Sequence, residues 1–335
     1  MRTAVIVSTA RTPIGKAYRG AFNNTGTGTL GGHAVAQAVA RAGIDPAEVE
    51  ELVFGAALQQ GCQASNQARR VALMGGLPVT TAAMSVDRQC ASGLMAIATA
   101  AKQIIVDGID IAVGGGGDSL SLVQTEKFNT DRMRDERILA LKPEVFMPMI
   151  DTAEVVAKRY HIDRELQDAY ALQSQQRTAA AQAAGRLDAE IVPLGVVKSV
   201  TDKASGTVSL QEVTLSRDEG NRPDTTLAGL CRLSPVRDGG CITAGNASQL
   251  SDGAAACVLM EGRLAEKRNL VPLGIYRGMA VAGTEPDEMG IGPVFAVPKL
   301  LRRNGLSVKD IGLWELNEAF AVQVLYCRDQ LQIPD

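Results

Sequence analysis

The 335-residue sequence has only two histidines, His33 and His161, and its six cysteines include no Cys-x-x-Cys pair. Closely spaced cysteines and histidines are the usual ligands of structural zinc, and disulfide scaffolds concentrate their cysteines in short chains. The sequence therefore supports neither a metal site nor a disulfide framework. We expect reduced thiols.

A strong net charge and a membrane-length hydrophobic run are also missing. The formal net charge is −3, which gives no basic surface for nucleic acid. No apolar run reaches the length of a membrane span, and residues 1–15 lack the long apolar block of a signal peptide. We expect a soluble, cytoplasmic protein with no nucleic-acid or membrane partner.

One cysteine, Cys90, precedes a long apolar segment in residues 84–108. The apolar residues after it recur at the spacing of a helix with a broad buried face: Leu94, Ile97, Ala98, Ala101, Ile104 and Ile105. Cys90 is thus predicted near the first turn of a helix, where unpaired N–H groups and the helix dipole favour a thiolate nucleophile. The alternative is a small apolar core residue.

The rest of the first third alternates between strand and helix patterns. Residues 3–10 and 52–56 are predicted as strands, and the helix 30–42 ends at Gly43. Asp45 and Pro46 begin a short helix. Residues 110–119 are predicted as an apolar strand whose glycine run, residues 114–117, forms a tight turn with close backbone approach, the alternative being a phosphate cradle.

Residues 119–249 are richer in charge and are predicted as an insertion between two more regular halves. They contain a long helix from residue 152 to 185, broken near His161 and restarted by Asp163 as N-cap. A catalytic role for His161 is disfavoured. Residues 199–229 are polar and rich in turn-forming residues, which is typical of loops.

An internal repeat links the two ends of the chain. Residues 34–56 align without gaps on residues 296–318 and share the order helix, glycine, capped short helix and strand. Two βαβ-type units of this kind predict pseudo-symmetric halves that pack together. The same offset places the counterpart of Cys90 beyond Asp335.

Five motifs in order give the chain a strong resemblance to the thiolases, the family of acetyl-CoA acetyltransferases and 3-ketoacyl-CoA thiolases. They are QCASGLMA, GGGGDSLS, TAEVVAKRYHIDRELQDAYALQSQQ, GCITAGNASQLSDGAAA and WELNEAFAVQ. The resemblance implies an α/β thiolase-like fold with two pseudo-symmetric halves, layered α-β-α-β-α, and an inserted loop domain. We expect the first half at residues 1–118, completed by about 250–265, the loop domain at 119–249 and the second half at 266–335.

The same resemblance implies roles for particular residues. Cys90 matches the cysteine that carries the acyl group as a thioester, and Asn317 matches the asparagine that positions a water for the enolate of acetyl-CoA. Ser248, Arg222 and Phe320 match contacts to coenzyme A. Met289 and Met149 match positions near the acyl pocket, where methionine is as often plain packing. The implied ligands are acetyl-CoA, 3-ketoacyl-CoA and CoA, without a metal or organic cofactor.

Two departures from the family stand out. Pro148 occupies the position of a histidine that precedes Thr-Ala-Glu. The sequence ends before the Gly-His-Pro and Cys-x-Gly segments, whose histidine activates the nucleophile and whose cysteine serves as acid and base. Either the sequence is part of a longer thiolase, or it is a degenerate member that binds acyl-CoA or a partner without turnover.

We therefore expect a homodimeric or homotetrameric acyltransferase of fatty-acid metabolism. It would cleave 3-ketoacyl-CoA with CoA or condense two acetyl units. The alternatives are a non-catalytic CoA-binding homologue and a ketoacyl synthase-like condensing enzyme, which also uses a cysteine at a helix start. The asparagine-containing motifs around residues 246 and 317 argue against the second alternative.

Overall fold

The computed structural model describes residues 2–334, which separate into two compact units. Unit 1 comprises residues 2–129, 185–220 and 250–276, and unit 2 comprises residues 130–184, 221–249 and 277–334. The domain boundaries expected from the sequence stay predictions. Each unit is described by itself below.

Unit 1 is built on a seven-stranded sheet with the order β4-β3-β5-β8-β1-β9, in which the short β2 pairs with β8. The core strands β3 and β5 are parallel to each other, as are β3 and β4, while β8 runs antiparallel to both β5 and β1. The strands are β1 Ala4–Arg11, β2 Gly15–Lys16, β3 Glu51–Gly55, β4 Ala82–Val86, β5 Ile111–Ser119, β8 Ser251–Glu261 and β9 Gly274–Ile275.

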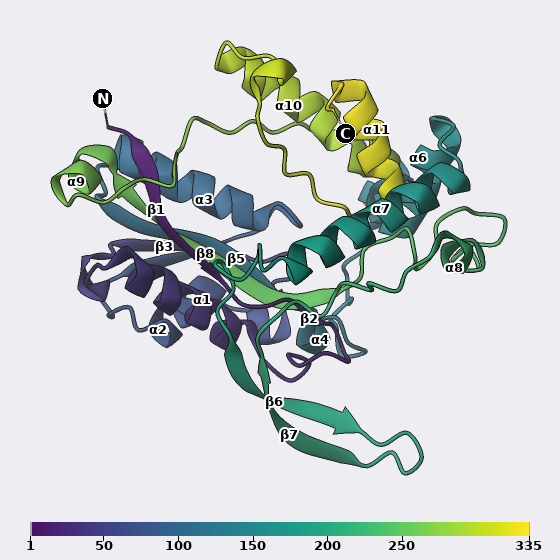
Figure 1. The fold of residues 1–335 in the computed structure, drawn as a ribbon, viewed down its shortest axis with the longest axis horizontal. Coiled ribbons are helices and arrows are strands. Elements are labelled where there is room, and N and C mark those ends of the chain that lie inside the picture. The colour runs from purple at the N-terminus through teal and green to yellow at the C-terminus, as the bar shows by residue number, and fades with distance from the viewer. Residues whose placement is uncertain (1, 335) are drawn as a thin grey trace. The chain divides into compact units, whose positions relative to one another are not determined.

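Helices cover both faces of this sheet (Figure 1). On one face, α1 and α2 share a core with side chains such as Leu30, Val35 and Phe54. On the other face, α3 packs Ala96 and Ala100 on the sheet, and the π-helical turn that follows it adds Ile104. The helical segments of unit 1 are α1 Thr27–Ala42, η1 Pro46–Glu48, η2 Gly61–Gln63, α2 Gln67–Met74, α3 Ser92–Lys102, the π-helical turn η3 Gln103–Asp107, α4 Leu120–Val123 and α9 Gly262–Lys267.

Two glycines let α3 approach the sheet closely. A Cβ atom at Gly55 would collide with the Ser92 carbonyl, and one at Gly114 would lie 2.8 Å from Ile97 Cα. The predicted close backbone approach at residues 114–117 is therefore confirmed. The predicted tight turn is wrong, because all four glycines lie within β5 and pair with neighbouring strands.

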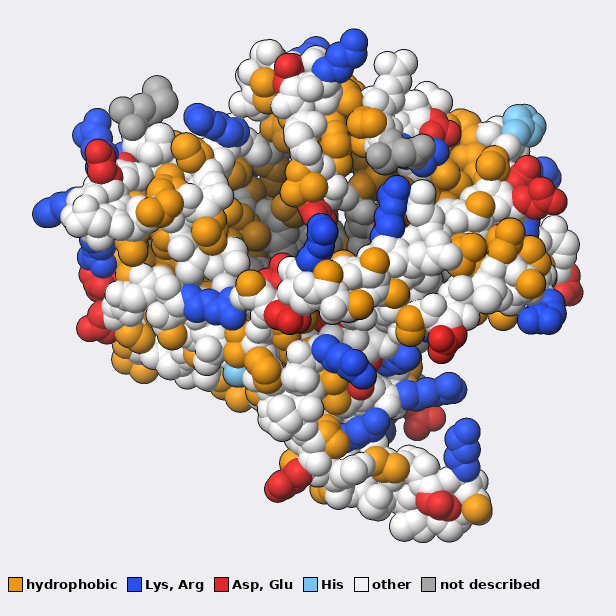
Figure 2. All heavy atoms as spheres, viewed as in Figure 1, with side chains coloured by type: hydrophobic (Ala, Val, Ile, Leu, Met, Phe, Trp, Pro, Cys, Tyr) orange, Lys and Arg blue, Asp and Glu red, His pale blue; other side chains and the backbone are white. Residues whose placement is uncertain are grey.

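Unit 1 also carries the hairpin of β6 Leu194–Thr201 and β7 Val208–Leu215. It projects from the sheet in Figure 1, and Figure 2 shows isolated hydrophobic side chains among charged ones along it. The Asn23 side chain holds β6 by pairing with both the N–H and the carbonyl of Ser199, at 3.0 and 2.8 Å. The expectation of a loop over residues 199–229 is thus wrong at the end of β6 and at β7, and also at residues 227–229, which begin the helix α8 Leu227–Cys231.

Unit 2 consists of helices and connecting loops around a small core that includes Val156, Ile242, Ile291 and Phe320. Its helical segments are α5 Glu136–Leu141, η4 Pro143–Phe146, α6 Met149–Arg159, α7 Arg164–Ala183, α8 Leu227–Cys231, η5 Pro286–Ile291, α10 Gly292–Arg303, η6 Val308–Asp310 and α11 Ala321–Leu331. The break near His161 is confirmed, with His161 at φ 55° and the Asp163 carboxylate accepting from the Leu166 N–H.

The internal repeat is confirmed in its local features. Gly43 and Gly305 both follow a helix with φ 65°, and each is followed by a 3₁₀-helix with a capping box, made by Asp45 and Glu48 in one copy and by Ser307 and Asp310 in the other. The predicted strand forms only in the first copy, as β3. Within residues 2–334 the segment 311–318 pairs with no sheet.

The segment Gln89–Asp107 is long and apolar enough to cross a membrane by length and composition alone. The expectation that no apolar run reaches the length of a membrane span is therefore wrong. The finding is weak evidence for a span, because the core helix of a globular protein passes the same test. Here the helix packs Ala96, Ala100 and Ile104 into the core of unit 1.

We expect Gly55→Ala to lower the free energy of unfolding by about 1–3 kcal/mol, because the new methyl group must push α3 from the sheet. Gly274→Ala is the matched control: no atom lies within 4 Å of its Cβ position, so its effect should stay within about 0.5 kcal/mol. Chemical denaturation measures both. Equal midpoints for the two variants would show that α3 does not depend on the close approach.

Candidate active site

Cys90 lies in the five-residue connection 87–91 between β4 and α3. The connection folds as a tight turn, in which the Ala91 N–H donates to the Arg88 carbonyl and the Ser92 N–H to the Gln89 carbonyl, both at 3.0 Å. Gln89 has φ 48°, which is uncommon for a residue with a side chain. The turn therefore holds a strained residue directly before the cysteine.

Two side chains hold this turn in place. The buried Ser92 hydroxyl accepts from the Arg88 N–H at 2.8 Å and donates to the Gln89 carbonyl at 2.6 Å. The Asp87 carboxylate accepts from the Gln89 N–H at 2.7 Å. The backbone on both sides of Cys90 is thereby fixed.

The Cys90 side chain itself is exposed. The alternative of a buried packing residue is therefore wrong for this cysteine. It sits on a sharp strand-to-helix turn just before the first turn of α3, whose backbone N–H groups have no intrahelical partners. Such a turn presents a nucleophile to a ligand, and neighbouring N–H groups can stabilise an oxyanion.

A cavity of about 460 Å³ opens beside Cys90 within unit 1. Its wall is largely backbone and small side chains of β5 and β8, including the glycine run 114–117. A cavity of this size can hold a small organic ligand. A second thiol, Cys257, also lines it, but burial raises the Cys257 pKa to about 12, so this thiol stays protonated and inert.

The charged side chains that line the cavity are already engaged. Arg11 forms ion pairs with Glu190 at 2.8 Å and with Asp218 at 2.7 Å. Asp118 accepts from Gln63 Nε2 at 2.7 Å and from the Ala57 N–H at 3.2 Å, and burial raises its pKa. These groups shape the cavity wall.

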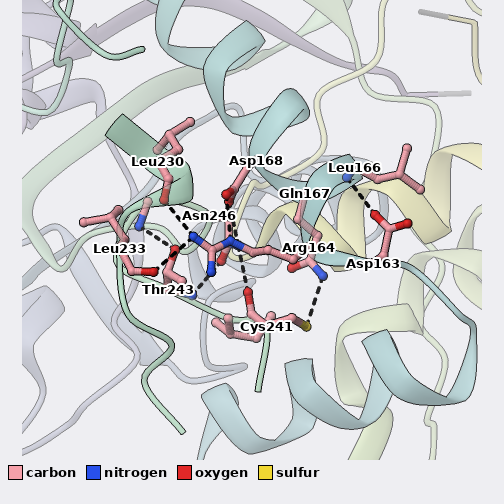
Figure 3. A network of polar contacts seen from close by, with 12 residues as sticks. Asp163, Arg164, Leu166, Gln167, Asp168, Leu230, Leu233, Cys241, Thr243 and Asn246 are labelled. Carbon is pink, nitrogen blue, oxygen red and sulfur yellow. Dashed lines mark hydrogen bonds and ion pairs between the residues drawn. The ribbon is translucent and has the colours of Figure 1, made fainter. Parts of the chain in front are cut away.

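In unit 2, the segment 240–249 is held by α7, as Figure 3 shows. The buried Asp168 carboxylate accepts from Arg164 Nε at 2.7 Å and from Asn246 Nδ2 at 3.1 Å. The Asn246 side chain also accepts from the Thr243 N–H and donates to the Cys241 carbonyl. One buried amide therefore fixes both the loop's shape and its attachment to the helix.

Glu154, in the Thr-Ala-Glu motif of α6, fastens the other end of this segment. Its carboxylate accepts from the N–H groups of Cys241 and Ile242 at 3.0 and 2.9 Å. Burial raises the pKa of the Cys241 thiol, which also lies 3.3 Å from Gln167 Nε2. This thiol therefore belongs to the support of the loop.

The segment 240–249 pairs with the segment that follows Asn317. Ala247 and Phe320 form an antiparallel bridge, the Ser248 N–H donates to the Ala319 carbonyl at 2.9 Å, and the Ala321 N–H donates to the Asn246 carbonyl at 2.9 Å. The structure thus brings Ser248, Asn317 and Phe320 into one part of unit 2. The other predicted residues of that unit are Arg222, Met149 and Met289.

The exposure of these residues differs. Asn317 and Ser248 are exposed, whereas Phe320 is 8% exposed and packs in the core of unit 2. Met149 at the start of α6 and Met289 in η5 are both exposed, and Arg222 lies in a loop where its backbone N–H donates to Gln175 Oε1 at 2.8 Å. Their roles in binding stay predictions.

Sequence reasoning missed the polar residues that support these elements. They are Ser92 and Asp118 in unit 1, and Glu154 and Asp168 in unit 2. For Asp168 the available signal was the oppositely charged pair that it forms with Arg164 at the i,i+4 spacing. Among residues 2–334, no group of three His, Cys, Asp or Glu side chains is placed to hold a metal ion.

Family models match nearly the whole chain. Residues 4–263 match the N-terminal domain of thiolase, and residues 270–335 match the thiolase C-terminal domain. The chain is 43% identical over 337 aligned residues to a 3-ketoacyl-CoA thiolase of Bacillus subtilis, covering 100% of this chain and 85% of the relative. It is 42% identical to the peroxisomal 3-ketoacyl-CoA thiolase B of Rattus norvegicus, with 98% and 76% covered.

Solved structures agree with the family models. Human mitochondrial 3-ketoacyl-CoA thiolase superposes with a TM-score of 0.85 at 36% identity, covering 99% of this chain and 84% of that one. The acetyl-CoA acetyltransferase of Bacillus anthracis gives 0.86 at 35% identity, with 100% and 84% covered. The predicted thiolase-like α/β fold is confirmed, and the chain belongs to the thiolase family.

Proposed function

We propose that the protein is an acyl-CoA acyltransferase that cleaves 3-ketoacyl-CoA with CoA, or condenses two acetyl-CoA molecules, through a thioester on Cys90. The observation that carries the proposal is the exposed Cys90 on a turn clamped by Ser92 at the start of α3. Family membership and the names of the thiolase relatives support the same reaction class.

In the cleavage direction, Cys90 Sγ attacks the C3 carbonyl of the substrate. The carbonyl oxygen takes the negative charge, which the Cys90 N–H helps to stabilise. The C2–C3 bond then breaks, its electrons leave as the enolate of acetyl-CoA, and protonation of the enolate gives acetyl-CoA. A second CoA thiol displaces the acyl group from Cys90, its proton returns to the medium and the thiolate is restored.

The residues of unit 2 take the binding roles in this proposal. Asn317 orients a water toward the enolate oxygen, because its exposed amide lies in a turn whose backbone is fixed by neighbouring segments. Ser248, Arg222 and Phe320 serve the coenzyme A arm, and Met149 and Met289 the acyl group. CoA is a substrate, and the proposal requires no metal or organic cofactor.

Acylation of Cys90 tests the proposal directly. After incubation with acetyl-CoA, intact-mass and peptide analysis should find one acetyl group on Cys90 in the wild type, and Cys90→Ala should abolish the label. Cys231→Ser is the matched control, because Cys231 is the other exposed thiol and lies in α8 of unit 2. That variant should be labelled like the wild type.

Two other results separate the alternatives. Binding of acetyl-CoA without a label or turnover would contradict the acyltransferase and favour the non-catalytic CoA-binding homologue. A label that appears only with carrier-protein thioesters would favour the ketoacyl synthase-like enzyme.

Asn317→Ala should separate the two halves of the reaction. We expect kcat for cleavage of acetoacetyl-CoA to fall roughly a hundredfold, the usual loss when one oxyanion donor is removed. Acetylation of Cys90 by acetyl-CoA should keep its wild-type rate, since no enolate forms in that step. Steady-state kinetics and the acylation rate measure both. If the two rates fell equally, Asn317 would have no specific role in the enolate step.

We further propose a cytoplasmic homo-oligomer of fatty-acid metabolism. The support in the structure is β4, which lies at the edge of the sheet, carries no charged side chain and leaves Met84 37% exposed. An uncharged edge strand is a template for pairing with another chain. If β4 of one copy paired with β4 of a second copy across a twofold axis, both subunits would use the same surface.

Met84→Lys should shift the protein toward the monomer, because each edge then brings a buried charge into the contact. Light scattering after size exclusion measures the mass over a concentration series. Val271→Lys is the control, since Val271 is 83% exposed and lies in the loop after α9. An unchanged oligomer in Met84→Lys would exclude the β4 edge as the interface.

A further inference from the structure

Two hydroxyl groups of α7 converge on one carboxylate in unit 2. Tyr170 Oη donates to Glu318 Oε1 at 2.6 Å, and Ser174 Oγ donates to Glu318 Oε2 at 2.8 Å. Tyr170 and Ser174 are four residues apart in α7, so they lie on the same face of the helix. Both oxygens of the Glu318 carboxylate are thus engaged from one rigid element.

Glu318 follows Asn317 directly, so its side-chain bonds attach α7 next to the turn that presents the asparagine amide. The turn's backbone is held at two further points: the Ala319 carbonyl accepts from the Ser248 N–H at 2.9 Å, and the Asn317 carbonyl accepts from Gln323 Nε2 at 3.2 Å. These bonds fix the chain path after Asn317. Glu318 adds the side-chain tie between this turn and α7.

The donors keep their protons under ordinary conditions. Burial, and then the Glu318 carboxylate, raise the Tyr170 pKa well above its usual range, so its hydroxyl remains a donor. A serine hydroxyl does not titrate in water. Hydrogen bonds to a charged acceptor are the strong ones, and two donors on one carboxylate also define its orientation.

We propose that Tyr170 and Ser174 are positioning residues that set the Asn317 turn through Glu318. The proposal rests on the proposed function, in which Asn317 serves the enolate step. Neither hydroxyl needs to touch substrate. Both act by holding the turn in the geometry at which the Asn317 amide can orient its water.

The test uses Tyr170→Phe, which keeps the ring and removes the hydroxyl, together with Ser174→Ala and the double variant. Each single variant should lower kcat for acetoacetyl-CoA cleavage roughly tenfold, the rate equivalent of one lost charged hydrogen bond. KM should change by less than about twofold, and acetylation of Cys90 by acetyl-CoA should keep its wild-type rate.

Two variants serve as controls. Ser174→Thr keeps a hydroxyl at the same position and should restore the cleavage rate. Thr178→Ala removes a hydroxyl one turn further along α7, where none of the side-chain hydrogen bonds described for residues 2–334 involves Thr178, and should behave as wild type.

Combination with Asn317→Ala distinguishes positioning from plain stabilisation. If the hydroxyls act through Asn317, Tyr170→Phe should cause no further loss of kcat in the Asn317→Ala background. Multiplicative losses, or an equal fall in cleavage and acylation rates, would overturn the proposal. So would wild-type kinetics in the double variant Tyr170→Phe, Ser174→Ala.

Failure of the proposed function would look different. It would appear as a wild-type protein that neither acetylates Cys90 nor cleaves acetoacetyl-CoA. The positioning proposal alone would be contradicted if the activity required Cys90 and Asn317 but did not change when Tyr170 and Ser174 were substituted.

Discussion

The close approach of α3 to the sheet is the constraint on which the nucleophile depends. Gly55 and Gly114 leave no side chain between strand and helix, so the Ser92 carbonyl and the Ile97 backbone lie directly on β3 and β5. This fixes where α3 begins and leaves a short connection after β4. A tight turn with Gln89 at positive φ then closes the gap, and the buried Ser92 hydroxyl stabilises that turn. The exposure of Cys90 is a consequence of packing beneath it.

Features that depend on a few neighbouring residues were predicted well from the sequence. The left-handed Gly43, the short helix begun by Asp45 and the restart of a helix at Asp163 all follow from capping chemistry within about four residues. The errors concern features set by distant partners. The glycine run extends β5 because β3 and β8 pair with it on both sides. The polar β7 becomes a strand because β6 pairs with it along its whole length.

The two copies of the internal repeat show which structural features depend on residues nearby in the sequence and which depend on distant ones. Both copies form a helix, a left-handed glycine and a capped 3₁₀-helix, since each of these is stabilised by contacts inside the segment. The strand appears only after Glu50, where β4 and β5 supply hydrogen bonds on either side. Similar sequences in the two copies therefore form the same helix caps. They form a strand only where a neighbouring sheet supplies hydrogen-bond partners for the backbone.

The same distinction applies to the candidate site. Its reactive residues stand out in motifs. Among the groups that hold them, Ser92 acts within four residues, whereas Glu154, Asp168 and Glu318 pair with segments far away in the sequence. In unit 2, Glu154 lies in α6, and the other two ties involve α7. Asp168 in α7 holds the loop that carries Ser248, and Tyr170 and Ser174 in α7 hold the turn that carries Asn317.

Because both segments are attached to α7 and paired with each other between Ala247 and Phe320, a shift of α7 would act on the segment of Ser248 and the segment of Asn317 together. Their relative geometry is then preserved even when the helix moves. A ligand that spans both segments would meet two contact points whose spacing is set in advance, which lowers the entropy lost on binding.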